Sequence, residues 1–93
     1  MSGGYFDYNQ FHIDEIAREI ERFLDERTDS DWDKQFYSSL SEKTIEAIRE
    51  YTQVIKKAAI YAHRIDYLLS GDDGEESFHR RVEEDLAKLD ENV

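Results

Sequence analysis

The chain has no cysteine and no proline among its 93 residues, and it has only one tryptophan and one methionine. Without cysteine it cannot form a disulfide framework, a thiolate nucleophile or a Cys-ligated zinc site. Without proline, no helix is interrupted by a missing backbone N–H. A chain of this length leaves no room for a doubly wound sheet, a barrel or a two-domain cleft. We therefore expect a single domain spanning residues 1–93.

Long hydrophobic runs are also absent. The longest uncharged, mostly apolar stretch covers only residues 58–62, whereas a membrane span needs about 20 residues. The first eight residues have neither the basic start nor the apolar core of a signal peptide. The sequence therefore predicts a soluble protein of the cytoplasm that does not enter a membrane.

Basic residues are scarce, with 12 Lys and Arg against 23 Asp and Glu, which gives a net charge of −11. A polymer of DNA or RNA is bound by neutralising its phosphates with Lys and Arg, so we do not expect nucleic acid polymer as a partner. The acid is unevenly placed, because residues 1–34 and 71–93 each carry a net charge of −6 and residues 35–70 carry +1. Within the central stretch, residues 56–64 hold three basic residues and no acid. These bases either pair with carboxylates of neighbouring helices or form a small anion site.

Apolar residues recur at helical intervals along most of the chain, which favours a folded protein over the disorder that 38% charged residues can signal. The pattern predicts an all-α fold, a small helical bundle with one long central helix and two shorter helices packed on it. The expected segments are an N-terminal motif at 1–8, a helix at 9–27, a connection at 28–40, the long helix at 42–69 and a last helix at 74–91. Within the connection, aromatic residues at roughly helical spacing also fit a short helix.

The expected long helix has clear end signals. Ser39 or Ser41 can cap its start, and Gly71 is a natural left-handed terminator. Its 28 residues would extend about 42 Å, but a compact chain of this mass has a radius of gyration of only about 12 Å. Because such a helix overhangs its own domain, we expect a homo-oligomer, either a dimer or a tetramer.

The N-terminal segment combines glycine with aromatic residues. Ser2, Gly3 and Gly4 precede Tyr5 and Tyr8. Two glycines allow a ligand to approach the backbone closely and offer successive N–H donors to a phosphate. Tyrosine rings can stack on nucleobases. The alternative is that these aromatic residues simply cap the bundle.

The segment from Ser70 to Gly74 joins the long helix to the last one. A helix C-cap followed by an N-cap explains its residue types. The start of the last helix is also an anion-binding end, and the carboxylate of Asp72 can accept hydrogen bonds from a guanine edge.

Catalysis finds little support in the sequence. His12, His63 and His79 are scattered, and no Ser-His-Asp arrangement or phosphate-binding G-x-x-x-x-G-K-[ST] loop is present. No motif supplies a preorganised set of metal ligands. We therefore expect a protein that is not an enzyme and that needs no metal or cofactor.

Two motifs give a resemblance to known proteins. Residues 1–8 read Met-Ser-Gly-Gly-Tyr-Phe-Asp-Tyr, and residues 64–76 read Arg-Ile-Asp-Tyr-Leu-Leu-Ser-Gly-Asp-Asp-Gly-Glu-Glu. Together with the helical middle they resemble a family of small bacteriophage proteins, the anti-CBASS sponges. The resemblance implies immune evasion, in which an oligomer captures cyclic oligonucleotides such as 3′3′-cGAMP without cleaving them, in the cytoplasm of the infected bacterium.

The resemblance also implies which residues bind the ligand. A cyclic dinucleotide needs two phosphates neutralised and two purines stacked. The Gly3 and Gly4 amides with Lys57 and Arg64 would meet the phosphates. The remaining contacts would come from rings and polar side chains: Tyr5, Tyr8 and Tyr67 on the bases, Asp72 on a guanine, and Ser2 and Ser70 as extra donors.

Two other functions remain open. A small acidic helical body can imitate the phosphate array of DNA and occupy a basic cleft of a host defence protein. The nearly neutral long helix argues against this DNA mimic, which needs an ordered acidic stripe. A structural or scaffold role is the third possibility.

Overall fold

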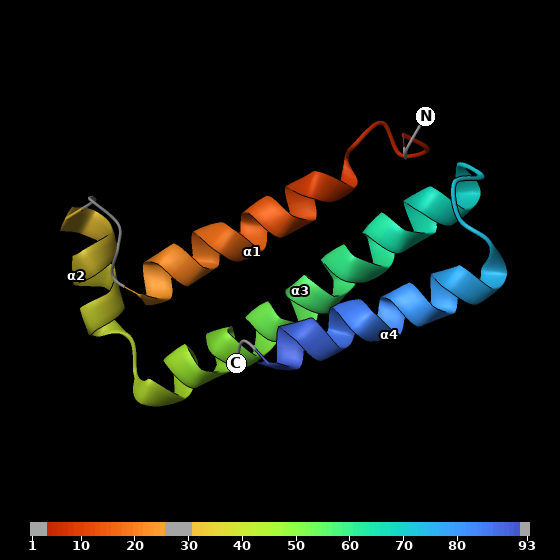
Figure 1. Cartoon of the computed structure of the whole chain (residues 1–93). Helices are drawn as coiled ribbons and strands as arrows, with labels where there is room; N and C mark the ends of the chain where they lie inside the picture. Colours follow the sequence, from red (N-terminus) through yellow and green to blue (C-terminus); the bar gives the residue numbers. More distant parts are fainter. Residues whose placement is uncertain (1–3, 26–30, 92–93) are drawn as a thin grey trace.

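The computed structural model of the chain describes residues 4–25 and 31–91, and this part contains four α-helices and no strand. They are α1 (Gln10–Leu24), α2 (Asp31–Ser39), α3 (Glu42–Leu69) and α4 (Glu75–Glu91). The long helix α3 runs the length of the molecule, with α1 and α4 beside it and α2 at the end of α1 (Figure 1). The molecule extends 47 × 25 × 16 Å.

The all-α prediction is confirmed, but the described residues hold three shorter helices instead of two. The bounds of α3 agree with the prediction, while α1 is shorter than predicted and ends at Leu24. The predicted connection at 28–40 contains α2, which packs on α1 and not on the long helix. The part of that connection at 28–30 and the predicted helical residues 26 and 27 lie outside the described residues.

The contact between α1 and α3 follows a repeat of seven residues on both helices. The buried residues of α1 are Gln10, Ala17 and Leu24. Those of α3 are Ile45, Thr52, Ala59 and Asp66. Seven residues are nearly two helical turns, so each set forms one line along its helix. Small side chains on both lines let the helices approach closely. The buried hydroxyl of Thr52 donates a hydrogen bond to the carbonyl of Ile48 at 2.6 Å.

Both ends of α3 are fixed by local hydrogen bonds. At its start, the hydroxyl of Ser41 accepts the N–H of Thr44 at 3.3 Å, so Ser41 and not Ser39 is the cap. At its end, Gly71 has a left-handed φ of +79°. The N–H groups of Gly71 and Asp72 donate to the carbonyls of Leu68 and Tyr67, at 3.1 and 2.9 Å, which is the Schellman arrangement. The chain therefore reverses sharply into α4.

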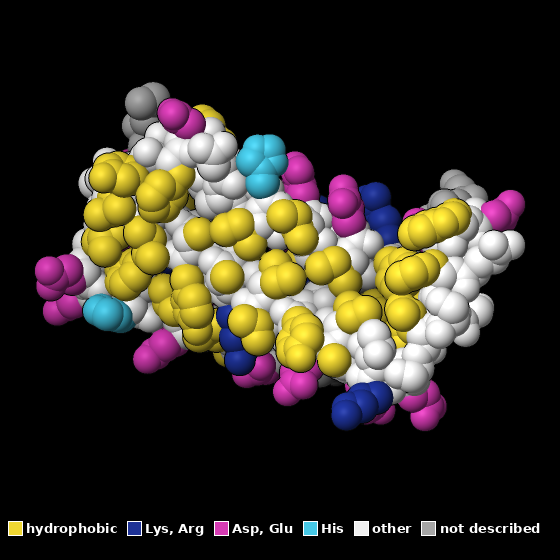
Figure 2. All heavy atoms as spheres, turned by 180° about the vertical axis from the view of Figure 1, so that it is seen from behind, with side chains coloured by type: hydrophobic (Ala, Val, Ile, Leu, Met, Phe, Trp, Pro, Cys, Tyr) yellow, Lys and Arg dark blue, Asp and Glu magenta, His cyan; other side chains and the backbone are white. Residues whose placement is uncertain are grey.

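The hydrophobic core is thin. Among the described residues, the buried hydrophobic side chains are Ala17, Leu24, Ile45 and Ala59. A larger set of hydrophobic side chains is exposed, and the face in Figure 2 carries such side chains along most of its length, with acidic groups mainly at its rim. No helix in the described ranges is long and apolar enough to cross a membrane.

Candidate functional site

The two segments that carry the family resemblance meet at Asp66. This side chain is fully buried, and its two carboxylate oxygens accept the backbone N–H groups of Gly4 at 2.9 Å and Phe6 at 3.0 Å. The N-terminal segment is therefore held against the last turns of α3, as Figure 1 also shows. Hydrogen bonds to a charged acceptor are stronger than neutral ones, so a single buried carboxylate can fix the position of this segment.

The N-terminal segment adopts an unusual backbone before α1 begins. Asp7 and Tyr8 have φ values of +54° and +64°, a left-handed conformation that costs about 1–2 kcal/mol for each L-residue. The N–H of Asp7 closes a turn onto the carbonyl of Gly4 at 3.1 Å, and Gly4 itself has a φ of +102°. Because Asp66 anchors the start of this turn, the strained turn is retained, and it sets the position of the Tyr8 ring.

A row of rings connects the N-terminal segment to α3. The ring of Tyr8 stacks on that of Phe11 at 6.2 Å between centroids, and Phe11 lies 5.5 Å from His63. His63 meets the ring of Tyr67 edge-on at 4.7 Å, and the guanidinium carbon of Arg64 lies 5.9 Å from the centre of the Tyr67 ring. The structure thus places three predicted ligand-binding residues, Tyr8, Arg64 and Tyr67, at one end of the molecule.

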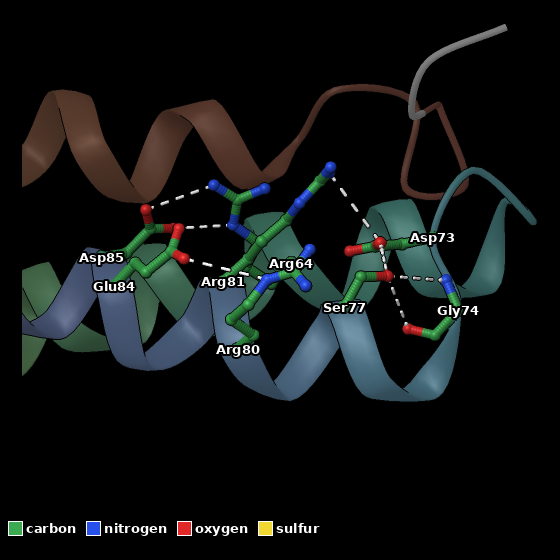
Figure 3. A network of polar contacts seen from close by, with 8 residues as sticks. All are labelled: Arg64, Asp73, Gly74, Ser77, Arg80, Arg81, Glu84 and Asp85. Carbon is green, nitrogen blue, oxygen red and sulfur yellow. Dashed lines mark hydrogen bonds and ion pairs between the residues drawn. The ribbon is translucent and has the colours of Figure 1, made fainter.

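Arg64 is held by an acid on α4. Its Nε donates to Asp85 Oδ2 at 2.6 Å and its Nη2 to Asp85 Oδ1 at 3.2 Å (Figure 3). The hydrogen bond to Asp85 raises the pKa of Arg64 further above its ordinary high value, against the opposing effect of partial burial. Lys56 is likewise paired with Glu21 of α1. The cationic stretch predicted from the sequence is therefore balanced by carboxylates of neighbouring helices at these two positions.

A groove of about 410 Å³ runs between α1 and α4 across the surface of α3. Its walls combine apolar side chains such as Phe11 and Leu89 with the paired charges Glu21, Lys56 and Asp85. Gln10 also lines this groove, and its buried Oε1 has no hydrogen-bond partner in the described part of the chain. An unpartnered buried acceptor is uncommon, so this end of the groove suits a hydrogen-bond donor.

Tyr5 lies apart from the row of rings. It packs edge-on against Phe6 at 5.2 Å and lines a second hollow, of about 460 Å³, together with Ile13 and Ala62. Gln10 lines both this hollow and the groove. Tyr5 and Tyr67 therefore do not form one stacking pair within a single copy of the chain.

The turn between α3 and α4 is built from its own side chains. Ser77 Oγ accepts the N–H of Gly74 at 3.2 Å and donates to Asp73 (Figure 3). Arg81 Nη1 lies 3.8 Å from Asp73 Oδ1, the oxygen that accepts the hydrogen bond of Ser77. The hydroxyl of Ser70 is buried without a partner among the described residues. A helix-cap arrangement therefore explains most of this turn.

The other predicted site residues fall in different places. Ser2 and Gly3 lie outside the described residues. The N–H of Gly4, predicted to meet a phosphate, instead donates to Asp66. Lys57 is exposed on α3 and lines neither the groove nor the second hollow. Asp72 is exposed in the turn.

Sequence reasoning missed Asp66, Phe11, His63 and Asp85 as parts of this region. For Asp66 the sequence held a usable signal, because it stands seven residues after Ala59 on the line that faces α1. An acid on an otherwise apolar line needs buried donors. Asp85 carried no comparable signal. It stands 21 positions after Arg64, and nothing in the sequence indicates that these two residues meet.

No protein-family model, curated protein or solved structure matches this chain. Within the described ranges, no group of His, Asp or Glu side chains is arranged to hold a metal ion.

Proposed function

We propose that this chain is a bacteriophage immune-evasion protein that binds cyclic oligonucleotide second messengers, such as 3′3′-cGAMP, and sequesters them without cleavage. It would act as an oligomer in the cytoplasm of the infected bacterium. The observation that supports this function best is the junction at Asp66, which joins the two motif segments and presents the row of rings from Tyr8 to Tyr67. The two segments on which the resemblance rests are thus one structural unit.

The chemistry of this unit suits a ring-bearing anion. Tyr8 and Tyr67 offer aromatic faces to a purine, and each base stacked on an aromatic side chain contributes about 1–3 kcal/mol. Arg64 has five N–H donors, of which Asp85 uses one on Nε and one on Nη2. In the proposed complex, other N–H groups of Arg64 donate to a phosphate oxygen while Asp85 keeps the guanidinium in place. The proposal therefore needs no rearrangement of the α3–α4 contact.

The test is a thermal-shift assay of the purified protein with a panel of cyclic di- and trinucleotides. Binding to the folded state raises the melting temperature according to RT ln(1+[L]/Kd). Mass spectrometry of the denatured complex should then recover the nucleotide intact. Either no shift with any cyclic nucleotide or recovery of a linear product would contradict the proposal. The first result together with salt-sensitive binding to a basic protein would favour the DNA-mimic alternative.

Tyr8→Ala should weaken nucleotide binding by about 10- to 100-fold, because one stacked ring is lost. The matched control is Phe36→Ala, which removes another exposed aromatic side chain, on α2 at the far end of the molecule. Isothermal titration calorimetry measures both variants. Equal weakening by the two variants would place the ligand elsewhere.

A further inference from the structure

In the described part of the chain, helices α1 and α4 pack on two faces of α3 and leave a third face exposed. The line through Ala59 and Asp66 faces α1. Arg64 lies on a second side, which faces α4. With 100° between successive residues, a third line lies about 130° from the first, on the side of α3 opposite the groove. This line, which we call the α3 seam, consists of Ala47, Tyr51, Val54, Ala58, Tyr61 and Ile65.

The α3 seam has the spacing of a helix interface. Its members alternate at intervals of four and three residues, the repeat by which one helix packs along another. Yet Tyr51 and Val54 are 63% and 61% exposed, and Ala58, Tyr61 and Ile65 are exposed as well. Leu69 extends the exposed apolar surface toward the end of α3, and Figure 2 shows a hydrophobic band of this kind along the molecule.

The accessible surface of the chain is larger than that of a compact monomer of the same mass. The chain has an accessible surface of 6972 Å², whereas a monomeric globular protein of 11.1 kDa is expected to have about 5,700 Å². The excess is about 1,300 Å², and a stable interface of standard size buries about 800 Å² on each partner. The radius of gyration of 16.1 Å likewise exceeds the roughly 12 Å of a compact chain of this length.

We infer that the α3 seam is the surface by which a second copy of this chain binds, so that two copies bury their seams against each other. A second copy matches in chemistry, because it brings an equally long apolar seam with a small residue, Ala58, near its middle. A net charge of −11 on each copy opposes association, but charge at the rim is screened over about 8 Å at physiological salt. The inference rests on the oligomer that the proposed function includes, but not on the ligand.

The test compares two alanine-to-glutamate variants. Ala58 and Ala87 are both exposed helical residues, the first on the α3 seam and the second on α4. Both substitutions add one negative charge, and neither site is buried in the single copy. Sedimentation equilibrium of the wild type in about 0.15 M salt should give at least twice the mass of one chain.

Ala58→Glu buries an unpaired charge in the interface, so it should raise the dissociation constant by at least about 100-fold. Ala87→Glu should leave that constant within about threefold of the wild-type value. Circular dichroism checks that both variants keep their helix content. A monomeric wild type, or equal dissociation of the two variants, would overturn the inference. Because neither readout involves a nucleotide, failure here leaves the ligand-binding test unaffected, and the reverse also holds.

Discussion

The two ends of the molecule are held in different ways. At the C-terminal end of α3, directional polar contacts dominate: Asp66 binds the N-terminal segment and Arg64 binds Asp85. At the opposite end of the molecule, α2 has no buried residue and packs on α1, where the ring centroids of Phe23 and Tyr37 lie 5.6 Å apart. Hydrogen bonds to charged groups fix one geometry, whereas contacts between half-exposed rings tolerate several. The arrangement at the C-terminal end of α3 is therefore more sharply defined than the arrangement at α2.

Removal of the Asp66 carboxylate should give the largest effect on a single copy. Asp66→Ala leaves the N–H groups of Gly4 and Phe6 without their acceptor, so we expect the free energy of unfolding to fall by about 2–3 kcal/mol. Urea denaturation followed by circular dichroism measures this change. Hydrogen exchange should also show faster exchange of the Gly4 and Phe6 amides.

The control for Asp66 is Asp90→Ala, which removes the same charge from an exposed position of α4 and should change stability by less than about 0.5 kcal/mol. If both variants lose the same stability, the effect comes from net charge, and the hydrogen bonds to Asp66 do not hold this end of the molecule in place.

Loss of the Arg64–Asp85 pair should give the next largest effect. The side chains are 19% and 23% exposed, so the pair lies between a surface ion pair and a buried one, and Arg64→Ala should cost about 2 kcal/mol. A raised pKa stabilises the fold at every pH below the ordinary pKa of arginine and loses its effect only above it. The difference between wild type and variant should therefore stay constant from about pH 6 to 9.

Arg80→Ala is the matched control for Arg64→Ala, because it also removes an arginine paired with an acid, but at an exposed position. Arg80 Nε lies 3.8 Å from Glu84 Oε1. It should cost less than about 0.5 kcal/mol. A cost as large as that of Arg64→Ala would mean that the two ion pairs contribute equally despite their different burial.

The smallest effect is expected at the α2 end. Trp32 is 68% exposed and stacks on Phe36 at 5.1 Å, so Trp32→Ala should lower the free energy of unfolding by less than about 1 kcal/mol. Circular dichroism is the appropriate measurement, because Trp32 is the only tryptophan of the chain and its removal abolishes tryptophan fluorescence. A loss larger than that of Asp66→Ala would reverse the comparison between the two ends.

Much of the secondary structure could be predicted from the sequence. The bounds of α3 followed from a serine able to cap its start and from Gly71, the residue type that best adopts the left-handed conformation found there. The helix α2 was expected only as a short helix within a connection, because its few apolar residues follow one another at only roughly helical spacing. In the structure none of its residues is buried. Spacing along the chain reports helix faces, but it does not say which helix covers each face.

The candidate site was less predictable for the same reason. The sequence placed Tyr8, Arg64 and Tyr67 in two separate motifs, but the contact that unites those motifs depends on Asp66, more than 60 residues from Gly4. The pairing of Arg64 with Asp85 depends on how the α3–α4 turn directs the last helix. Tertiary contacts at such separations are set by the packing of whole helices, which local patterns do not encode.

The repeat of seven on α1 and α3 permits more than one alignment of the two helices. If α1 slid along α3 by one repeat, mostly small or apolar residues would still face one another, so the packing of these side chains distinguishes such alignments poorly. The slide would carry Gly4 and Phe6 away from Asp66, and a carboxylate buried without donors costs several kcal/mol. One acid among the buried residues of α3 thus selects a single alignment from several of similar hydrophobic content.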